Sequence, residues 1–131
     1  MEQELARYRS VEKVHDLPDI YHVWSHAFLG PKLEAVGFSS IESMWAEAIG
    51  QVAAESDGHR LEIVSLGSGN CDLELDLASR LIADGITDFQ LTCLEINAEM
   101  LLRGQVSAEQ RGLQRSDVLL VAARQRFEAR T

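Results

Sequence analysis

Two glycines and one carboxylate are the residues of this 131-residue chain whose types and spacing could do chemistry. Gly67 and Gly69 flank Ser68 directly after a short apolar run, and Glu95 follows a second apolar run. Glycine has no Cβ and tolerates positive φ, so a ligand can lie against bare backbone at such a turn. A carboxylate at the end of the next strand can accept hydrogen bonds from ribose hydroxyls. Together these features predict a site for a nucleoside.

Three short strands and two helices would position these residues. Residues 61–66, 89–94 and 118–121 are apolar runs typical of buried strands. Between them, apolar residues at helical spacing indicate one helix that ends near Gly85 and a second that begins after Asn97. This alternation requires right-handed crossovers and a parallel sheet, so the expected fold class is α/β. The glycine turn and Glu95 would then share one edge of the sheet.

The segment just before the first strand reads as an amphipathic helix. Seven apolar residues repeat with helical period, which predicts that their stripe lies in the core. Ser39 and Glu42 have the spacing of a capping box at the start of this helix. The stripe consists of Ile41, Met44, Trp45, Ala48, Ile49, Val52 and Ala53.

An aromatic-rich stretch that precedes Gly30 and Pro31 also reads as helical. The Gly-Pro pair is expected to stop this helix, because both residues interrupt regular helical structure. Its aromatic side chains, Tyr21, Trp24 and Phe28, are expected in the core and not in an aromatic cage.

Histidine and cysteine offer little further chemistry. His22 and His26 stand four residues apart, as in zinc-binding pairs, but no third ligand is evident, so we expect no metal site. Cys71 follows the glycine turn at a helix start, where the pKa of a thiol can fall. No neighbouring base is identifiable, so packing is its expected role.

Composition narrows the class of protein. The chain is 46% hydrophobic and 25% charged, an ordinary composition for a soluble domain. Its net charge of −9 argues against general nucleic-acid binding, which needs a basic surface. No apolar run approaches the roughly 20 residues that span a bilayer, and no signal peptide is evident at the start. We expect a cytoplasmic protein without membrane contact.

Two segments resemble the motifs of class I S-adenosylmethionine-dependent methyltransferases. Residues 63–72, Ile-Val-Ser-Leu-Gly-Ser-Gly-Asn-Cys-Asp, look like the first motif of that family. Residues 94–101, Leu-Glu-Ile-Asn-Ala-Glu-Met-Leu, look like its acidic segment after the second strand. The resemblance covers about residues 61–121. It implies a Rossmann-like sheet with strand order 3-2-1 and S-adenosylmethionine as cofactor.

The resemblance also implies roles for single residues. Gly67, Ser68 and Gly69 would pass under the methionine moiety, Glu95 would bind the ribose hydroxyls, and Ile96 would flank the adenine. No catalytic residue is implied, and the methyl acceptor, expected to be a small molecule, is not identified. The implied cofactor-binding residues are Gly67, Ser68, Gly69, Asn70, Glu95 and Ile96.

The main rival in the same fold class is an NAD(P)-dependent oxidoreductase. The dinucleotide fingerprint asks for a third glycine where this chain has Asp72. A pyrophosphate at the helix start would also face the acids Asp72 and Glu74. S-adenosylmethionine carries no phosphate, so the acidic first turn favours the methyl donor.

Several features depart from the methyltransferase pattern. Ser65 stands where an acid is common, and Ala122 and Ala123 stand where another acid often follows the third strand. The sequence also stops after the third predicted strand. Residues 61–66 read as a strand buried on both faces, yet one of its edges would lack a partner. We therefore expect a missing C-terminal half, or self-association, to complete the sheet.

These observations predict a single domain, with an N-terminal helical segment at 1–58 and an S-adenosylmethionine-binding Rossmann-like region at 59–131. The expected function is methyl transfer from S-adenosylmethionine to a small-molecule acceptor, or the cofactor-binding half of such an enzyme. The alternative is a non-catalytic scaffold of the same fold that acts by association. An NAD(P)-dependent oxidoreductase is the third reading.

Overall fold

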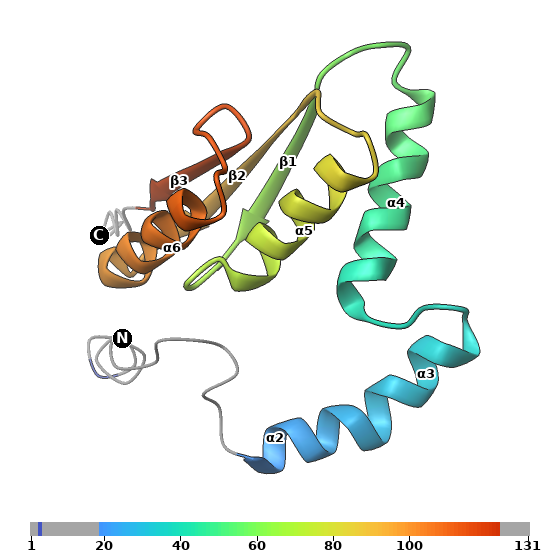
Figure 1. Cartoon of the computed structure of the whole chain (residues 1–131). Helices are drawn as coiled ribbons and strands as arrows, with labels where there is room; N and C mark the ends of the chain where they lie inside the picture. Colours follow the sequence, from blue (N-terminus) through green and yellow to red (C-terminus); the bar gives the residue numbers. More distant parts are fainter. Residues whose placement is uncertain (1–2, 4–18, 124–131) are drawn as a thin grey trace, which may run out of the picture.

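The computed structural model describes Gln3 and residues 19–123 (Figure 1). Three parallel strands form one sheet with β2 between its two neighbours. The helix α5 connects β1 to β2, and α6 connects β2 to β3, which confirms the predicted α/β class with a parallel sheet. The elements of this unit are β1 (Leu61–Leu66), α5 (Asp72–Ala83), β2 (Phe89–Glu95), α6 (Ala98–Gln110) and β3 (Val118–Ala122).

The three strands finish together at one edge of the sheet. Leu66 stands beside Leu94, and Glu95 stands beside Ala122. Hydrogen bonds continue past the strand ends, because the Gly67 N–H donates to the Leu94 carbonyl oxygen at 2.8 Å. The glycine turn and Glu95 therefore leave the sheet side by side.

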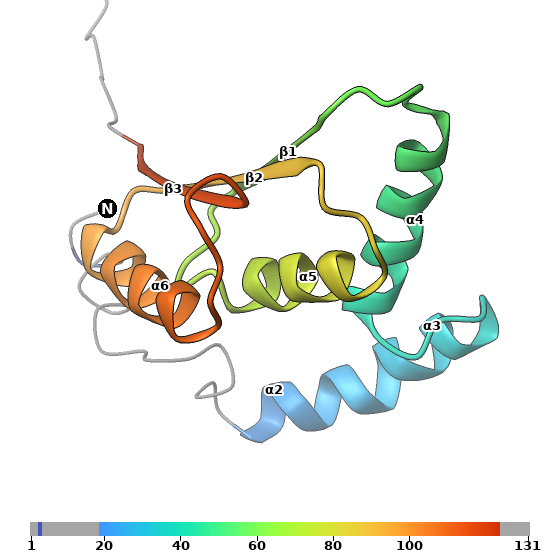
Figure 2. The ribbon, with the colours of Figure 1, turned by 45° about the horizontal axis from the view of Figure 1, so that its top comes forward.

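Within the described residues, helices cover one face of the sheet. Figure 2 shows α5 and α6 together below the strands. Burial alternates along β2, as expected for a strand that is covered on one face. The other face of β1 is bare, with Val64 60% and Leu66 78% exposed. The prediction that residues 61–66 are buried on both faces is wrong, because β1 is an edge strand with helices on one side only.

The core lies between the sheet and the two helices. Phe89, Leu91 and Cys93 fill the apolar inward positions of β2, and α5 contributes the apolar face of its central turns. Close packing of these groups supplies the main favourable term in folding. The most deeply buried apolar residues are Cys71, Leu75, Ala78, Leu81, Phe89, Leu91, Cys93 and Val118.

The helix α4 (Ile41–Glu55) packs against α5 with a face that overlaps the predicted stripe only in part. Ala46 is buried, and Ile49 and Ala53 pack against the core, whereas Trp45 and Val52 are about half exposed. The predicted stripe is therefore only partly in the core. Ala46, Ile49 and Ala53 face the core, whereas Trp45 and Val52 turn toward solvent.

The start of α4 is capped one residue later than the sequence pattern indicated. Ser40 is the N-cap, and its Oγ accepts a 3.1 Å hydrogen bond from the Ser43 N–H. The Ser43 hydroxyl in turn accepts from the Ser40 N–H. The predicted capping box of Ser39 and Glu42 is wrong, because a second serine replaces the acid in this reciprocal arrangement.

Before α4, the chain forms one continuous helical arm. It consists of α2 (Asp19–Trp24), a π-helical turn η2 (Ser25–Leu29) and α3 (Gly30–Ala35). The predicted stop at Gly30 and Pro31 is wrong. The Gly30 N–H donates to the Ser25 carbonyl across a wider turn, and the proline ring occupies the first turn of α3, where no N–H is needed.

The aromatic residues of this arm are not in the core. Trp24 is 55% and Phe28 is 58% exposed, and their rings lie 5.7 Å apart. The prediction that they are core residues is therefore wrong, because the arm extends away from the sheet and its covering helices (Figure 2). The side chains of Tyr21 and His22, and residues 1–2 and 4–18 of the predicted N-terminal segment, lie outside what the structure describes.

Candidate functional site

The loop between β1 and α5 turns sharply through three left-handed residues. Gly67 has φ +70°, Gly69 has φ +57°, and Cys71, the N-cap of α5, has φ +61°. Glycine adopts this conformation without penalty, whereas a residue with a Cβ pays on the order of 1 kcal/mol. The two glycines therefore allow the turn, and Cys71 is held in it by complete burial.

Glu95 connects this loop to the end of β2 by hydrogen bonds. Its Oε2 accepts a 2.8 Å hydrogen bond from the Gly69 N–H. Its Oε1 accepts from the N–H groups of Ile96 at 2.8 Å and Asn97 at 2.9 Å. The carboxylate is buried, and charge-assisted bonds to backbone N–H groups are stronger than neutral ones. Gly69 and Glu95, predicted to share one edge, are thus joined directly.

The other predicted site residues lie around this bond. A Cβ added at Gly67 would meet no described heavy atom within 4 Å, so the backbone there borders open space. Ser68 is buried, and its Oγ accepts from the Cys71 thiol at 3.4 Å. Asn70 is buried inside the loop, whereas Ile96 is 40% exposed at the sheet edge.

The first turns of α6 complete the surroundings of the loop. Asn97 caps α6 as predicted, because its Oδ1 accepts from the Glu99 and Met100 N–H groups. The Arg103 Nε donates to Asn70 Oδ1 at 3.1 Å. A Cβ at Gly69 would lie 3.3 Å from Met100 Cε, so this helix presses directly on the glycine turn.

Gly104 sets how closely α6 approaches the loop, and the sequence analysis did not find it. A Cβ at this position would lie 2.9 Å from the Asn70 carbonyl oxygen and 3.3 Å from Cys71 Sγ. The available signal was a glycine within a helical pattern, which costs about 0.5–1 kcal/mol relative to alanine and marks close packing.

Glu74 is a second buried acid beside the loop. It lies in the first turn of α5, and its Oε1 accepts a hydrogen bond from the Ser65 hydroxyl. Ser65 precedes Gly67 by two residues, at the carboxyl end of β1. Ser65, which stands where the methyltransferase pattern commonly has an acid, therefore contacts the carboxylate of Glu74 on the following helix. No pattern in the sequence indicates that these two residues pair.

The two cysteines are partners within the core. A hydrogen bond from the Cys93 thiol lowers the pKa of Cys71, and burial and the nearby carboxylates of Glu74 and Glu95 act in the opposite direction. The same hydrogen bond, together with burial, raises the pKa of Cys93. Neither side chain reaches solvent, so this pair packs the loop against β2 and offers no accessible nucleophile.

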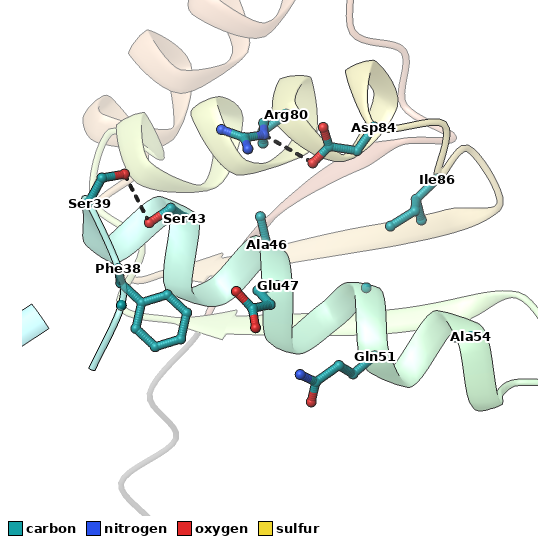
Figure 3. Close-up of a pocket in the computed structure, with 12 residues that line it drawn as sticks. Phe38, Ser39, Ser43, Ala46, Glu47, Gln51, Ala54, Arg80, Asp84 and Ile86 are labelled. Carbon is teal, nitrogen blue, oxygen red and sulfur yellow. Dashed lines mark hydrogen bonds and ion pairs between the residues drawn. The ribbon is translucent and has the colours of Figure 1, made fainter. Parts of the chain in front are cut away.

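A separate cavity lies between α4 and α5. Its volume is about 700 Å³, and its lining includes Phe38, Ser43, Glu47, Arg80 and Asp84 (Figure 3). The Arg80 guanidinium pairs with the Asp84 carboxylate at 3.0 Å along α5. None of the predicted cofactor-binding residues lines this cavity, so it is distinct from the glycine loop.

Two other kinds of site were sought in the described part of the chain. None of its helices combines the length and the apolar character that a membrane crossing needs. Its His, Cys, Asp and Glu side chains form no group of three or more that could hold a metal ion.

Comparison with known proteins adds no relative to this picture: no family model matches the chain, and neither does a curated protein or a solved structure. The fold and the loop geometry are therefore the basis for assigning a function.

Proposed function

We propose that this chain binds S-adenosylmethionine at the β1–α5 loop and is a methyltransferase, or the cofactor-binding half of one, that acts on a small-molecule acceptor. The observation that carries the proposal is the 2.8 Å hydrogen bond between the Gly69 N–H and Glu95 Oε2. This bond joins the backbone of the glycine turn to Glu95, the residue to which the resemblance assigns ribose binding, at one edge of the sheet.

The acceptor capacity of Glu95 is compatible with a ribose. A carboxylate offers about four acceptor positions, and three are taken by backbone N–H groups. The remaining position is on Oε2, on the side of the glycine turn, where one ribose hydroxyl could donate. Ile96, partly exposed beside it, would give the adenine an apolar surface.

Charge favours a cationic ligand over a phosphate. The carboxylates of Glu74 and Glu95 flank the loop, and both act on the buried Cys71 thiol. A pyrophosphate would meet these negative groups at short range, whereas the sulfonium of S-adenosylmethionine carries positive charge. The same reasoning makes the NAD(P)-dependent alternative the weaker one.

The contribution of this chain to catalysis would be binding and orientation. S-adenosylmethionine supplies a methyl group already activated by its sulfonium, so the protein needs mainly to hold an acceptor in line with the S–CH₃ bond. Gly67, Ser68 and Gly69 would support the methionine moiety, with Asn70 holding the loop to α6 through Arg103. No residue is assigned as general base.

We include in this proposal that the sheet is the 3-2-1 part of a Rossmann-like sheet, completed by a C-terminal half or by a second copy. The exposed edge and bare face of β1 support this, because unpaired strand edges favour association.

A pair of glycine variants tests the cofactor site. Gly67 and Gly58 both have positive φ, and a Cβ at either meets nothing within 4 Å. Gly67→Ala and Gly58→Ala should therefore cause similar backbone strain. We expect calorimetric titration to detect S-adenosylmethionine binding in the wild type and in Gly58→Ala, and to find it strongly weakened in Gly67→Ala. Absence of binding to the wild type would refute the proposal.

A second candidate function is a non-catalytic scaffold that keeps the glycine turn. The observation in its favour is that Glu95 already satisfies three backbone N–H groups, so the loop is stable as a purely structural feature. This candidate predicts no binding of labelled S-adenosylmethionine. If S-adenosylmethionine binds but no acceptor is methylated, the chain has the cofactor site without the catalytic role.

A further inference from the structure

Glu74 is placed where it could contact a ligand on the glycine loop. Glu74 is 8% exposed and lies in the first turn of α5, directly after the loop. The Ser65 hydroxyl at the end of β1 fixes its Oε1. The side chain therefore lies at the β1 side of the loop, whereas Glu95 lies at the β2 side.

The two buried carboxylates differ in how well they are satisfied. Glu95 accepts three backbone N–H groups, whereas Ser65 is the single hydrogen-bond donor to Glu74 in the described part of the chain, and no basic side chain there pairs with it. Burying a carboxylate with so few partners costs stability. Among the described residues, each side-chain oxygen that is fully shielded from solvent has a hydrogen-bond partner. Oε2 of Glu74 accepts no hydrogen bond, so this atom keeps contact with solvent.

We propose that Glu74 is a specificity-determining residue whose carboxylate binds the ammonium group at the amino-acid end of S-adenosylmethionine. This inference rests on the proposed function. The ligand would lie across the loop with its ribose at Glu95 and its ammonium at Glu74. An ammonium offers three donors to a carboxylate, and such charge-assisted bonds are roughly twice as strong as neutral ones.

A structural role for Glu74 makes a different prediction. A carboxylate in a first helical turn is favoured by the helix dipole, whatever ligand is present. In that case its replacement would change stability and would affect all ligands of the loop alike. The two roles are separated by a ligand that keeps the nucleoside and lacks the ammonium.

The test uses Glu74→Gln, whose amide oxygen can still accept from Ser65, with Asp72→Asn as a control that removes the same charge from the same turn. Binding is measured for S-adenosylmethionine and for 5′-deoxy-5′-methylthioadenosine, which has no amino-acid part. We expect Glu74→Gln to weaken S-adenosylmethionine by about tenfold or more and the nucleoside by less than about twofold. Asp72→Asn should change the ratio of the two affinities little.

The outcomes separate the two proposals. Equal weakening of both ligands, or of neither, in a folded Glu74→Gln variant overturns the role of Glu74 and leaves the cofactor site intact. If the wild type binds neither ligand, the proposed function fails, and this inference fails with it. Should Glu74→Gln not fold, the wild type is titrated with the 2-oxo analogue of S-adenosylhomocysteine, in which a carbonyl replaces the ammonium. Binding as tight as that of S-adenosylhomocysteine overturns the inference, and binding weakened about tenfold supports it.

Discussion

The Cα of Gly104 on α6 faces the carbonyl oxygen of Asn70 so closely that a methyl group between them would lie only 2.9 Å from that oxygen. This contact holds the glycine loop against the helix that follows β2. Because the obstructing atom belongs to the backbone, it cannot move aside as a flexible side chain would.

Gly104→Ala should therefore destabilise the fold. Overpacking of this kind costs about 1–3 kcal/mol, which exceeds the gain of up to about 1 kcal/mol from alanine in a helix. Gly50→Ala is the matched control, because it also lies within a helix and its Cβ would meet Ile86 at an ordinary 3.8 Å. Urea denaturation should find Gly104→Ala less stable than the wild type and Gly50→Ala equal or more stable. Equal stability of the two variants would contradict the close contact.

Glu95→Gln should loosen the loop even without ligand. The carboxylate accepts hydrogen bonds from three backbone N–H groups, and the amide nitrogen of glutamine cannot accept. At least one of these backbone donors therefore loses its partner, which lowers the free energy of unfolding by about 1–3 kcal/mol. Hydrogen exchange at the Gly69 amide should become faster. Glu62→Gln, at an exposed position on β1, is the control and should change stability by less than about 0.5 kcal/mol. Unchanged exchange at Gly69 in the Glu95 variant would show that the carboxylate does not hold the turn.

The cysteine pair should make stability depend on pH in two directions. The folded pKa of Cys71 is lowered below the ordinary thiol value of 9.0, so between that pKa and 9.0 the folded state holds fewer protons and stability rises with pH. The pKa of Cys93 is raised, so above 9.0 the unfolded state ionises both thiols while folded Cys93 keeps its proton, and stability falls. Denaturation across this range should show the rise and the fall. Cys93→Ala removes the bond that lowers the pKa of Cys71, and the rise should disappear.

If a second copy completes the sheet, association should depend on the bare face of β1. Val64→Lys places a charge on that face and should shift the mass measured by light scattering toward the monomer. Leu102→Lys is the control, because Leu102 is similarly exposed but lies on α6. A wild type that stays monomeric at all concentrations would contradict self-association and leave completion by a C-terminal half.

The sequence predicted the unit from β1 to β3 well, because each element there has a clear period and a clear boundary. Residues 61–66 are β1 as predicted, and Asn97 and Gly85 stand at the helix ends where their types are favoured. The N-terminal helices were predicted less well. Hydrophobicity predicted only part of the face of α4 that packs against the core, and it predicted a core position for Trp24, because it does not say which neighbour a helix meets.

The candidate site divides in the same way. Gly67, Gly69 and Glu95 could be found because they are tied to strand ends, and parallel strands end at a common edge. Gly104 and Glu74 could not, since their contacts depend on the distance between elements that are far apart in the chain. A helical period places a residue on a face, but only packing decides what that face touches.

The sequential order of the strands also bears on how the chain acquires its structure. Leu61 stands beside Phe89 and Leu91 beside Val118, so each strand pairs with its next neighbour after a gap of roughly 30 residues. Because each parallel pairing must close a segment of this length before its contacts form, such a topology should fold more slowly than a helical bundle of the same size, one strand–helix–strand step at a time. The β1–α5–β2 unit, which contains the whole glycine turn, would then be the first to form during synthesis.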